Sequence, residues 1–265
     1  SIFIYLSCFD FSHAEDTLVI NNYKNNPMAY SEGEQEKGIE IEIINEFVEW
    51  MKLKKKPNLT LKFVPYTDFD EFYKAVKKGP KNNIGLGSVT ISADRAKEVD
   101  FTVPYLKDVA FCITNGNSAD VKTKTSDNIT RALGSMSALT IENTSLNKYL
   151  HELKKQYLPD LRILNESNEE KILNEISKNV LYFAYVDAIA FWYYLKTNPG
   201  KFIKMQRVLS QSKEELGFIM PKGSKNKALF DEFFNGPSGF KTSSKYRAIL
   251  EKNLGSYMTQ NVSLQ

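Results

Sequence analysis

The stretch that organises the chain is residues 87–105, GSVTISADRAKEVDFTVPY, which begins with small and hydroxyl side chains and contains a single arginine, Arg95. A planar guanidinium matches a carboxylate with two parallel hydrogen bonds and stays charged at physiological pH. Arg95 is therefore a candidate anchor for a small anionic ligand. The alternative is an ordinary surface ion pair with Asp94 or Glu98.

The segments before this stretch alternate between strand and helix patterns. They predict strands at 17–20, 59–64 and 84–86, and helices that begin near 38 and 68. Such alternation with short connections is typical of a parallel sheet covered by helices on both faces. Small ligands bind at the carboxyl ends of the strands in such sheets, which is where Ser88 and Thr90 would lie.

A second series of strands and helices follows residue 105. It comprises a crossover strand at 109–114, strands at 139–142, 161–164 and 181–186, helices at 145–157, 169–178 and 187–196, and a return strand at 215–220. We therefore predict an α/β clamshell of two lobes with two hinge crossovers. Lobe 1 would comprise residues 15–108 and 215–265, and lobe 2 residues 109–214.

Polar residues at two places in the second lobe could complete a ligand site. Thr144 and Ser145 open a predicted helix, whose first amide groups favour a carboxylate, although a plain helix cap is the alternative. Asp187 ends an apolar strand, where a carboxylate needs a partner such as an ammonium group. The alternative for Asp187 is that it caps the helix that follows.

The motif TISADR at 90–95, followed by VDFTVPY at 99–105, resembles the type II periplasmic solute-binding proteins of polar amino-acid ABC importers, family 3. Ionotropic glutamate receptors have a related ligand-binding core. The resemblance spans nearly all of residues 17–254 and includes the turn ENTS at 142–145, where Asn143 replaces a glycine. It implies a site in which Arg95 holds the ligand's α-carboxylate and Asp187 its α-amino group. The other ligand contacts that it implies are Ser88, Thr90, Thr144 and Ser145.

The resemblance also locates positions that would contact the ligand's side chain. Phe69 falls where the family has an aromatic or aliphatic pocket residue, with core packing as the alternative. In the first loop, Asn25 stands where many members have a tyrosine, and Tyr23 lies two residues earlier. Asn22 stands where an acidic residue is common. We therefore expect the ligand's side chain to be recognised differently, and the sequence does not name the ligand.

Composition argues against several other functions. The net charge of +3 is small and its charges are mixed along the chain, so nucleic-acid binding has no electrostatic basis. The two histidines, His13 and His151, provide little material for a Ser/His/Asp set or a histidine metal site. We expect no metal, no cofactor and no catalytic group, in a monomer without a membrane span.

Residues 1–14 resemble the end of a secretory leader, with small residues at Ser12 and Ala14 where a signal peptidase cleaves. The alternatives are a lipoprotein leader processed at Cys8 and an ordinary first strand. Cys8 and Cys112 do not suggest a disulfide framework. Export is the favoured prediction, to the periplasm or the cell exterior, with or without a lipid anchor.

The predicted function is capture of an amino acid or related small zwitterion between two lobes, for delivery to an ABC permease in the membrane. The first alternative is the ligand-sensing module of a signalling receptor. The second is an enzyme similar to cyclohexadienyl or arogenate dehydratases, which would need a further acid in the pocket beyond the one that binds the amine.

Overall fold

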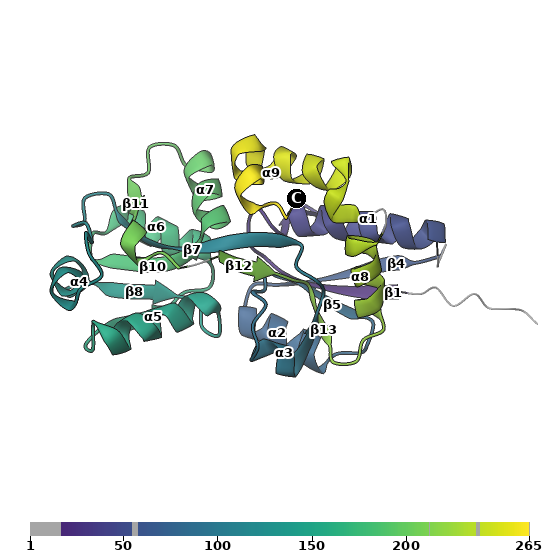
Figure 1. Cartoon of the computed structure of the whole chain (residues 1–265), viewed down its shortest axis with the longest axis horizontal. Coiled ribbons are helices and arrows are strands. Elements are labelled where there is room, and N and C mark those ends of the chain that lie inside the picture. Colours follow the sequence, from purple (N-terminus) through teal and green to yellow (C-terminus); the bar gives the residue numbers. More distant parts are fainter. Residues whose placement is uncertain (1–16, 55–57, 212, 237–238, 265) are drawn as a thin grey trace, which may run out of the picture.

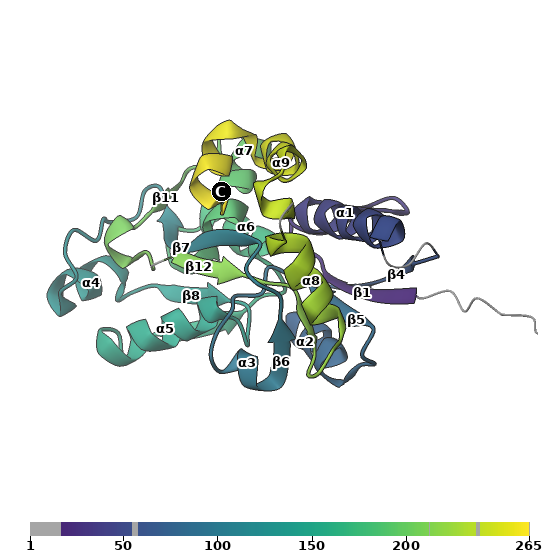
Figure 2. The same cartoon turned by 45° about the vertical axis from the view of Figure 1, so that its right-hand side comes forward.

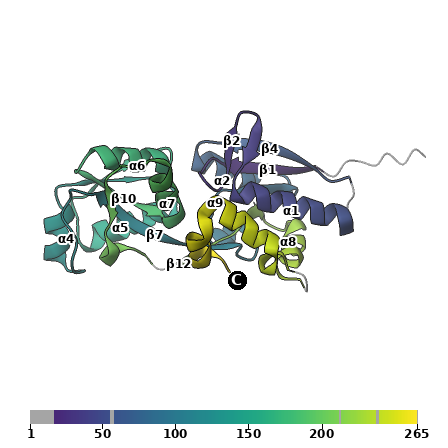
Figure 3. The ribbon, with the colours of Figure 1, turned by 90° about the horizontal axis from the view of Figure 1, so that it is seen from above.

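The structure is a computed structural model that describes residues 17–54, 58–211, 213–236 and 239–264. Two lobes lie end to end along the long axis of the molecule, each built on its own β-sheet (Figure 1). The view from above shows the same division (Figure 3). The α/β architecture of two lobes therefore agrees with the prediction. The leader residues, including Cys8 and Ala14, lie outside the described residues.

The first sheet has the strand order β4-β1-β5-β13-β6. Its strands are β1 (Thr17–Tyr23), β4 (Thr60–Tyr66), β5 (Asn83–Leu86), β6 (Val99–Phe101) and β13 (Ile219–Pro221). β1 lies between β4 and β5 and is parallel to both. Helices α1 (Ile39–Lys54), α8 (Asn226–Asn235) and α9 (Ser244–Val262) cover one face, and α2 (Phe69–Lys78) covers the other. Ile20 and Ile84 are fully buried between these layers.

The second sheet has the order β11-β7-β10-β8-β9, with β12 paired to β7. Its strands are β7 (Leu106–Asn115), β8 (Ser137–Thr140), β9 (Arg162–Asn165), β10 (Tyr182–Asp187), β11 (Ile203–Met205) and β12 (Lys213–Leu216). Helices α4 (Ser126–Leu133) and α5 (Ser145–Gln156) cover one face. Helices α6 (Glu169–Lys178) and α7 (Ala188–Thr197) cover the other. The remaining elements are β2 (Tyr30–Glu32), β3 (Gln35–Lys37), α3 (Arg95–Glu98), η1 (Arg207–Leu209) and η2 (Phe240–Thr242).

The two lobes are joined by the antiparallel strands β7 and β12 (Figure 1). In their register Glu214 lies opposite Asp108, and Leu216 opposite Leu106. The predicted lobe boundaries follow residues 108 and 214, which are the two members of the pair Asp108 and Glu214. The strand pair therefore carries the chain between the lobes in both directions at one place.

A third contact between the lobes comes from the end of α9. Gly255 has a φ of 76°, which bends the helix, and the residues after it include the buried Met258 and Val262. This end of α9 packs in one core cluster with Ile189 of α7. Figure 2 shows α9 beside α7. The C-terminal helix of the first lobe therefore also touches the second.

Some elements were not predicted from the sequence. One is the β2-β3 hairpin, where Glu36 accepts hydrogen bonds from Asn22 and Ser31. Another is helix α4, of which only Ile129 and Leu133 are buried. The predicted return strand is divided into β12 and β13. None of the helices in the described ranges is both long enough and apolar enough to cross a membrane.

Candidate functional site

Arg95 is the first residue of the short helix α3, and its guanidinium lies between the lobes. Nη1 donates to the carbonyl oxygen of Thr90 at 3.1 Å, and Nη2 donates to that of Asn143, in the second lobe, at 2.9 Å. The guanidinium carbon lies 5.5 Å from the centre of the Phe69 ring. Burial lowers the pKa of Arg95, whereas Glu214 and other anionic neighbours raise it.

The predicted alternative, an ion pair with Asp94 or Glu98, is wrong. Asp94 pairs with Lys97 at 2.9 Å, and Glu98 pairs with Lys77 at 2.7 Å. These acids therefore already have lysine partners on the surface. Among the described residues, the hydrogen bonds of the Arg95 guanidinium go to main-chain carbonyls, which leaves its positive charge without a bonded carboxylate.

A cavity of about 30 Å³ lies beside Arg95, and we call it the central cavity. Nine of the ten predicted site residues line it: Tyr23, Asn25, Phe69, Ser88, Thr90, Arg95, Thr144, Ser145 and Asp187. The structure does not bring Asn22 there, because its buried side chain donates to Glu36 Oε2 at 2.9 Å. A cavity of this size has room for roughly one or two water molecules, since each needs about 10–15 Å³ of such space. An amino acid therefore needs the lobes to separate before it can enter.

Ser88 is held in place by a buried acid that the sequence did not reveal. Its backbone N–H donates to Glu40 Oε1 at 3.0 Å, and the hydroxyl of Tyr105 donates to the same oxygen. Ser88 has a φ of 50°, a conformation that few residues other than glycine adopt. Glu40 is fully buried in α1, and burial raises its pKa to about 7. The strained turn after β5 is therefore fixed from inside the first lobe.

The second lobe presents the start of helix α5 to the cavity. Thr144 caps this helix, because its Oγ accepts from the N–H of Asn147 at 3.2 Å and donates to the carbonyl of Ile141 at 2.6 Å. Its hydroxyl is therefore occupied by the cap. The amide groups of Ser145 and Leu146 lie in the first turn, where a helix offers no internal acceptor, and both residues line the cavity. They are suitable donors for a carboxylate.

Asn143 supports the same turn. Its φ is 62°, in the left-handed region that asparagine tolerates better than most residues. This agrees with the expectation that asparagine can replace the glycine of this turn. Its side chain donates to Asp70 Oδ1 at 3.3 Å, which adds another contact between the lobes.

Glu214, in the hinge strand β12, is a second acid that the sequence did not reveal. Its carboxylate accepts hydrogen bonds from the hydroxyls of Thr90 and Tyr149, and from that of Ser145 at 3.3 Å. Thr90 and Ser145 are two of the hydroxyl residues predicted to contact the ligand. In this structure both hydroxyls are bonded to Glu214, so Arg95 and the amide groups of α5 remain as carboxylate donors.

Asp187 ends β10 and lies at the cavity, but its side chain makes no capping hydrogen bond to α7. The alternative of a simple helix cap is therefore wrong. Burial raises the pKa of Asp187 well above its usual value. The neighbouring carboxylates Glu169, Asp108 and Glu214 raise it further, and Arg95 lowers it. A cationic partner would relieve this repulsion.

Glu169, the first residue of α6, is a third buried acid that the sequence did not reveal. It is 5% exposed, and its Oε1 accepts from the N–H of Asp187 at 2.6 Å. Burial raises its pKa to about 7, while hydrogen bonds from Asp187 and Asn25 oppose this shift. Its position after the helix cap Asn168 suggested only a solvated first-turn acid, which is the usual environment of such a residue. The site therefore contains two adjacent acids, where the sequence predicted one.

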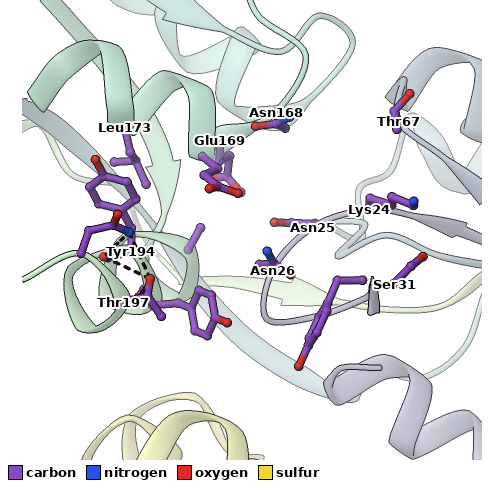
Figure 4. A pocket seen from close by; sticks show the side chains of 15 residues that line it. Lys24, Asn25, Asn26, Ser31, Thr67, Asn168, Glu169, Leu173, Tyr194 and Thr197 are labelled. Carbon is purple, nitrogen blue, oxygen red and sulfur yellow. Dashed lines mark hydrogen bonds between the residues drawn. The ribbon is translucent and has the colours of Figure 1, made fainter. Parts of the chain in front are cut away.

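Glu169 also connects the central cavity to a larger outer pocket of about 560 Å³. The outer pocket lies between the first loop and helices α6 and α7, and both Asn25 and Glu169 line the two spaces. Figure 4 shows the carboxylate of Glu169 facing Asn25 and Asn26. A ligand anchored at Arg95 could therefore extend a side chain past Glu169 toward the outer pocket.

The aromatic wall of the central cavity consists of Tyr23 and Phe69, whose rings meet edge to face at 5.5 Å. Both rings are almost fully buried, at 4% and 5% exposure. The hydroxyl of Tyr23 donates to the carbonyl of Ser167, in the second lobe, at 3.0 Å. Tyr23 therefore both lines the cavity and holds the lobes together.

The described ranges contain no group of three or more histidine, cysteine or acidic side chains arranged to hold a metal ion. Cys112 is a buried free thiol, and burial raises its pKa. The chemistry that the central cavity offers is therefore charge pairing and hydrogen bonding across two lobes.

Residues 18–256 match the family model of the bacterial extracellular solute-binding proteins, family 3. The chain belongs to this family. Family 3 proteins bind solutes outside the cytoplasm, and the clamshell described above is their fold. No curated protein matches the chain in sequence.

Solved structures of binding proteins share this fold. The GluR0 ligand-binding core from Nostoc punctiforme, in complex with L-glutamate, has a TM-score of 0.71 at 16% identity, over 90% of this chain and 100% of that one. The arginine-, lysine- and histidine-binding protein ArtJ from Geobacillus stearothermophilus has a TM-score of 0.71 at 18% identity, over 91% and 96%. The ancestral amino acid-binding protein AncCDT-1, a precursor of cyclohexadienyl dehydratase, has a TM-score of 0.68 at 20% identity, over 89% and 95%. At these identities the likeness shows the fold alone.

Proposed function

We propose that this family 3 protein captures an amino acid between its two lobes, outside the cytoplasm, and presents it to the permease of an ABC importer. The observation that carries the proposal is that Arg95, from the first lobe, and Asp187, from the second, line the same cavity. A cation and an anion on separate lobes match the two ends of a zwitterion. Several structures with this fold are of proteins whose names state that they bind amino acids.

In the proposed mechanism the ligand first meets Arg95 on the open first lobe. Bending at the strand pair β7-β12 then brings α5 and Asp187 onto the ligand. The amide groups at the start of α5 add donors for the carboxylate, and Asp187 accepts from the amine. Contacts that exist only in the closed state stabilise that state, and this stabilisation links binding to recognition by the permease.

The proposal is tested by screening the common amino acids with calorimetry and thermal shift. A ligand that binds only the folded protein raises its stability by RT ln(1 + [L]/Kd), which is about 2.7 kcal/mol at a concentration of 100 Kd. We expect one or a few amino acids to give a saturable gain of this kind. Failure of every amino acid to bind would contradict the proposal.

Arg95→Ala should abolish that gain, because a charged bidentate contact contributes roughly 3 kcal/mol or more. The matched control is Arg131→Ala, which removes an exposed arginine from α4. The unliganded Arg95→Ala protein should keep its far-ultraviolet circular dichroism spectrum. An undiminished gain in Arg95→Ala would remove this residue from the site.

A sensor module of a signalling receptor would use the same site with a different partner. A cyclohexadienyl or arogenate dehydratase is a second candidate function, because Glu169 provides a further acid at the cavity whose pKa is raised to about 7. Such an acid could protonate the substrate's ring hydroxyl, which leaves as water while the ring carboxylate leaves as CO₂ and the ring becomes aromatic. Release of phenylpyruvate or phenylalanine from prephenate or arogenate, lost in Glu169→Gln, would support this function.

A further inference from the structure

Charges around the central cavity are unequal. Among the described residues that line it, Arg95 is positive, whereas Glu169 and Asp187 are both acids. Two more buried acids, Asp108 and Glu214, do not line the cavity but also raise the pKa of Asp187. An amino acid with a neutral side chain brings one charge of each sign, which pair with Arg95 and one of the two acids of the cavity and leave the other acid without a cationic partner.

We propose that the ligand is an amino acid with a cationic side chain, a guanidinium or an ammonium group. The inference rests on the proposed function, since it assumes that Arg95 holds the carboxylate and Asp187 the α-amino group of an amino acid. Glu169 is then available for the second positive group. A buried carboxylate favours a bonded cation over a neutral amide, because the charged pair has shorter and stronger hydrogen bonds.

The outer pocket offers this second group a suitable environment. Glu169 and Asn25 form its boundary with the central cavity, and the buried Oδ1 of Asn26 makes no hydrogen bond within the described ranges. Lys24 also lines the outer pocket, but Figure 4 shows its amino group pointing away from Glu169. The carboxylate of Glu169 and the Oδ1 of Asn26 therefore offer acceptors, and a guanidinium or ammonium supplies donors without needing any.

Other ligand classes fit these charges less well. A diamine without a carboxylate would leave the guanidinium of Arg95 without an anionic partner. An amino acid with an acidic side chain would place a further carboxylate beside Glu169. Two adjacent negative charges repel each other strongly where water is excluded. An amino acid with a basic side chain is the class that satisfies both the cation and the acids.

The test compares ligands of nearly equal shape that differ in charge. Calorimetry at pH 7.5 on the wild-type protein would measure arginine against citrulline, and lysine against norleucine. We expect the charged member of at least one pair to bind ten times more tightly, or better. If in both pairs the neutral member binds as tightly as the charged one, the inference is overturned while the proposed function stands. If no amino acid binds, the proposed function itself fails.

A variant links the preference to the residue. Glu169→Gln keeps the size of the side chain and removes its charge, so the preference for the charged ligand should fall about tenfold. Glu175→Gln is the control, because Glu175 lies on the same helix at the surface, where it pairs with Lys178 at 3.8 Å. An unchanged preference in Glu169→Gln would overturn the role of Glu169. The comparison of ligands on the wild-type protein does not depend on the variant folding.

Discussion

Buried carboxylates occur in two regions of this molecule, and their surroundings differ. In the first lobe, Glu40 receives hydrogen bonds from the amide of Ser88 and the hydroxyl of Tyr105. At the cleft between the lobes, Asp187 has other carboxylates as its near neighbours, of which Glu169 is the first. Burial raises the pKa of all three acids.

The difference separates an acid that stabilises the fold from acids that are available to a ligand. Glu40 is held by groups of its own lobe and fixes the turn that carries Ser88. Asp187 and Glu169 repel each other, Arg95 relieves this repulsion in part, and protons or a cationic ligand would relieve it further. Repulsion between the carboxylates of a functional site lowers the stability of the unliganded protein. Replacing Glu40 should therefore lower the stability of the unliganded protein, whereas replacing Asp187 should raise it.

The largest effect is expected from Glu40→Ala. At pH 5.5, where most of this carboxyl is protonated, the change leaves two buried donors without an acceptor and opens a small void. We expect a loss of roughly 3 kcal/mol in the free energy of unfolding. Urea denaturation followed by circular dichroism would measure it. Glu46→Ala, which removes a carboxylate on the same helix that pairs with Lys245 at the surface, is the control and should cost less than about 1 kcal/mol. Equal losses in the two variants would contradict the structural role of Glu40.

The next effect is a dependence of stability on pH. The pKa of Glu40 is raised in the folded state from its usual 4.5 to about 7, so the folded protein holds this proton more tightly than the unfolded chain. The resulting stabilisation is complete below pH 4.5 and is lost as the pH rises through about 7. Between pH 5 and 8, wild type should lose about 2 kcal/mol more than Glu40→Gln does.

Denaturation curves for wild type and Glu40→Gln at several pH values would measure that difference. Glu169 and Asp187 also have raised pKa values and contribute with the same sign in both proteins, so only the difference between the two curves reports on Glu40. Parallel curves would show that Glu40 does not titrate in this range.

The smallest effect is expected from Asp187→Asn. Removing one of several mutually repelling acids should raise the stability of the unliganded protein at pH 8 by about 1 kcal/mol, instead of lowering it. Amino-acid binding should weaken at least tenfold in the same variant, because the amine loses its charged acceptor. Calorimetry and urea denaturation would measure the two quantities. A loss of stability would place Asp187 with Glu40 among the acids that hold the fold together.

The predicted site residues that the structure brings together share one property, which is their place at the end of a strand or the start of a helix. Arg95, Thr90 and Ser145 are of this kind, and the alternating pattern of strands and helices was enough to place them near one edge of each sheet. Asn22 was predicted from the family resemblance of the first loop, and its side chain instead meets the β2-β3 hairpin. This contact joins residues 14 apart in the chain, which no local pattern reveals.

The acids that the sequence did not reveal could not be recognised by pattern. Glu40, Glu169 and Glu214 each stand next to or within charged segments of ordinary composition, and such glutamates are usually solvated. What buries Glu214 is the pairing of β12 with β7, together with hydroxyls from both lobes. What buries Glu169 is the approach of the first loop to α6.

By itself, the sequence determined that two α/β units are connected by two crossovers. It also placed a guanidinium at the ligand edge of the first unit and a carboxylate at the ligand edge of the second. Periodicity and the chemistry of strand ends are local properties, so they can be read directly from neighbouring residues. Only the tertiary structure decided which glutamates lose their water, because burial depends on segments far apart in the chain. The balance of charge at the cleft follows from that burial, and with it the kind of ligand that the cleft can accept.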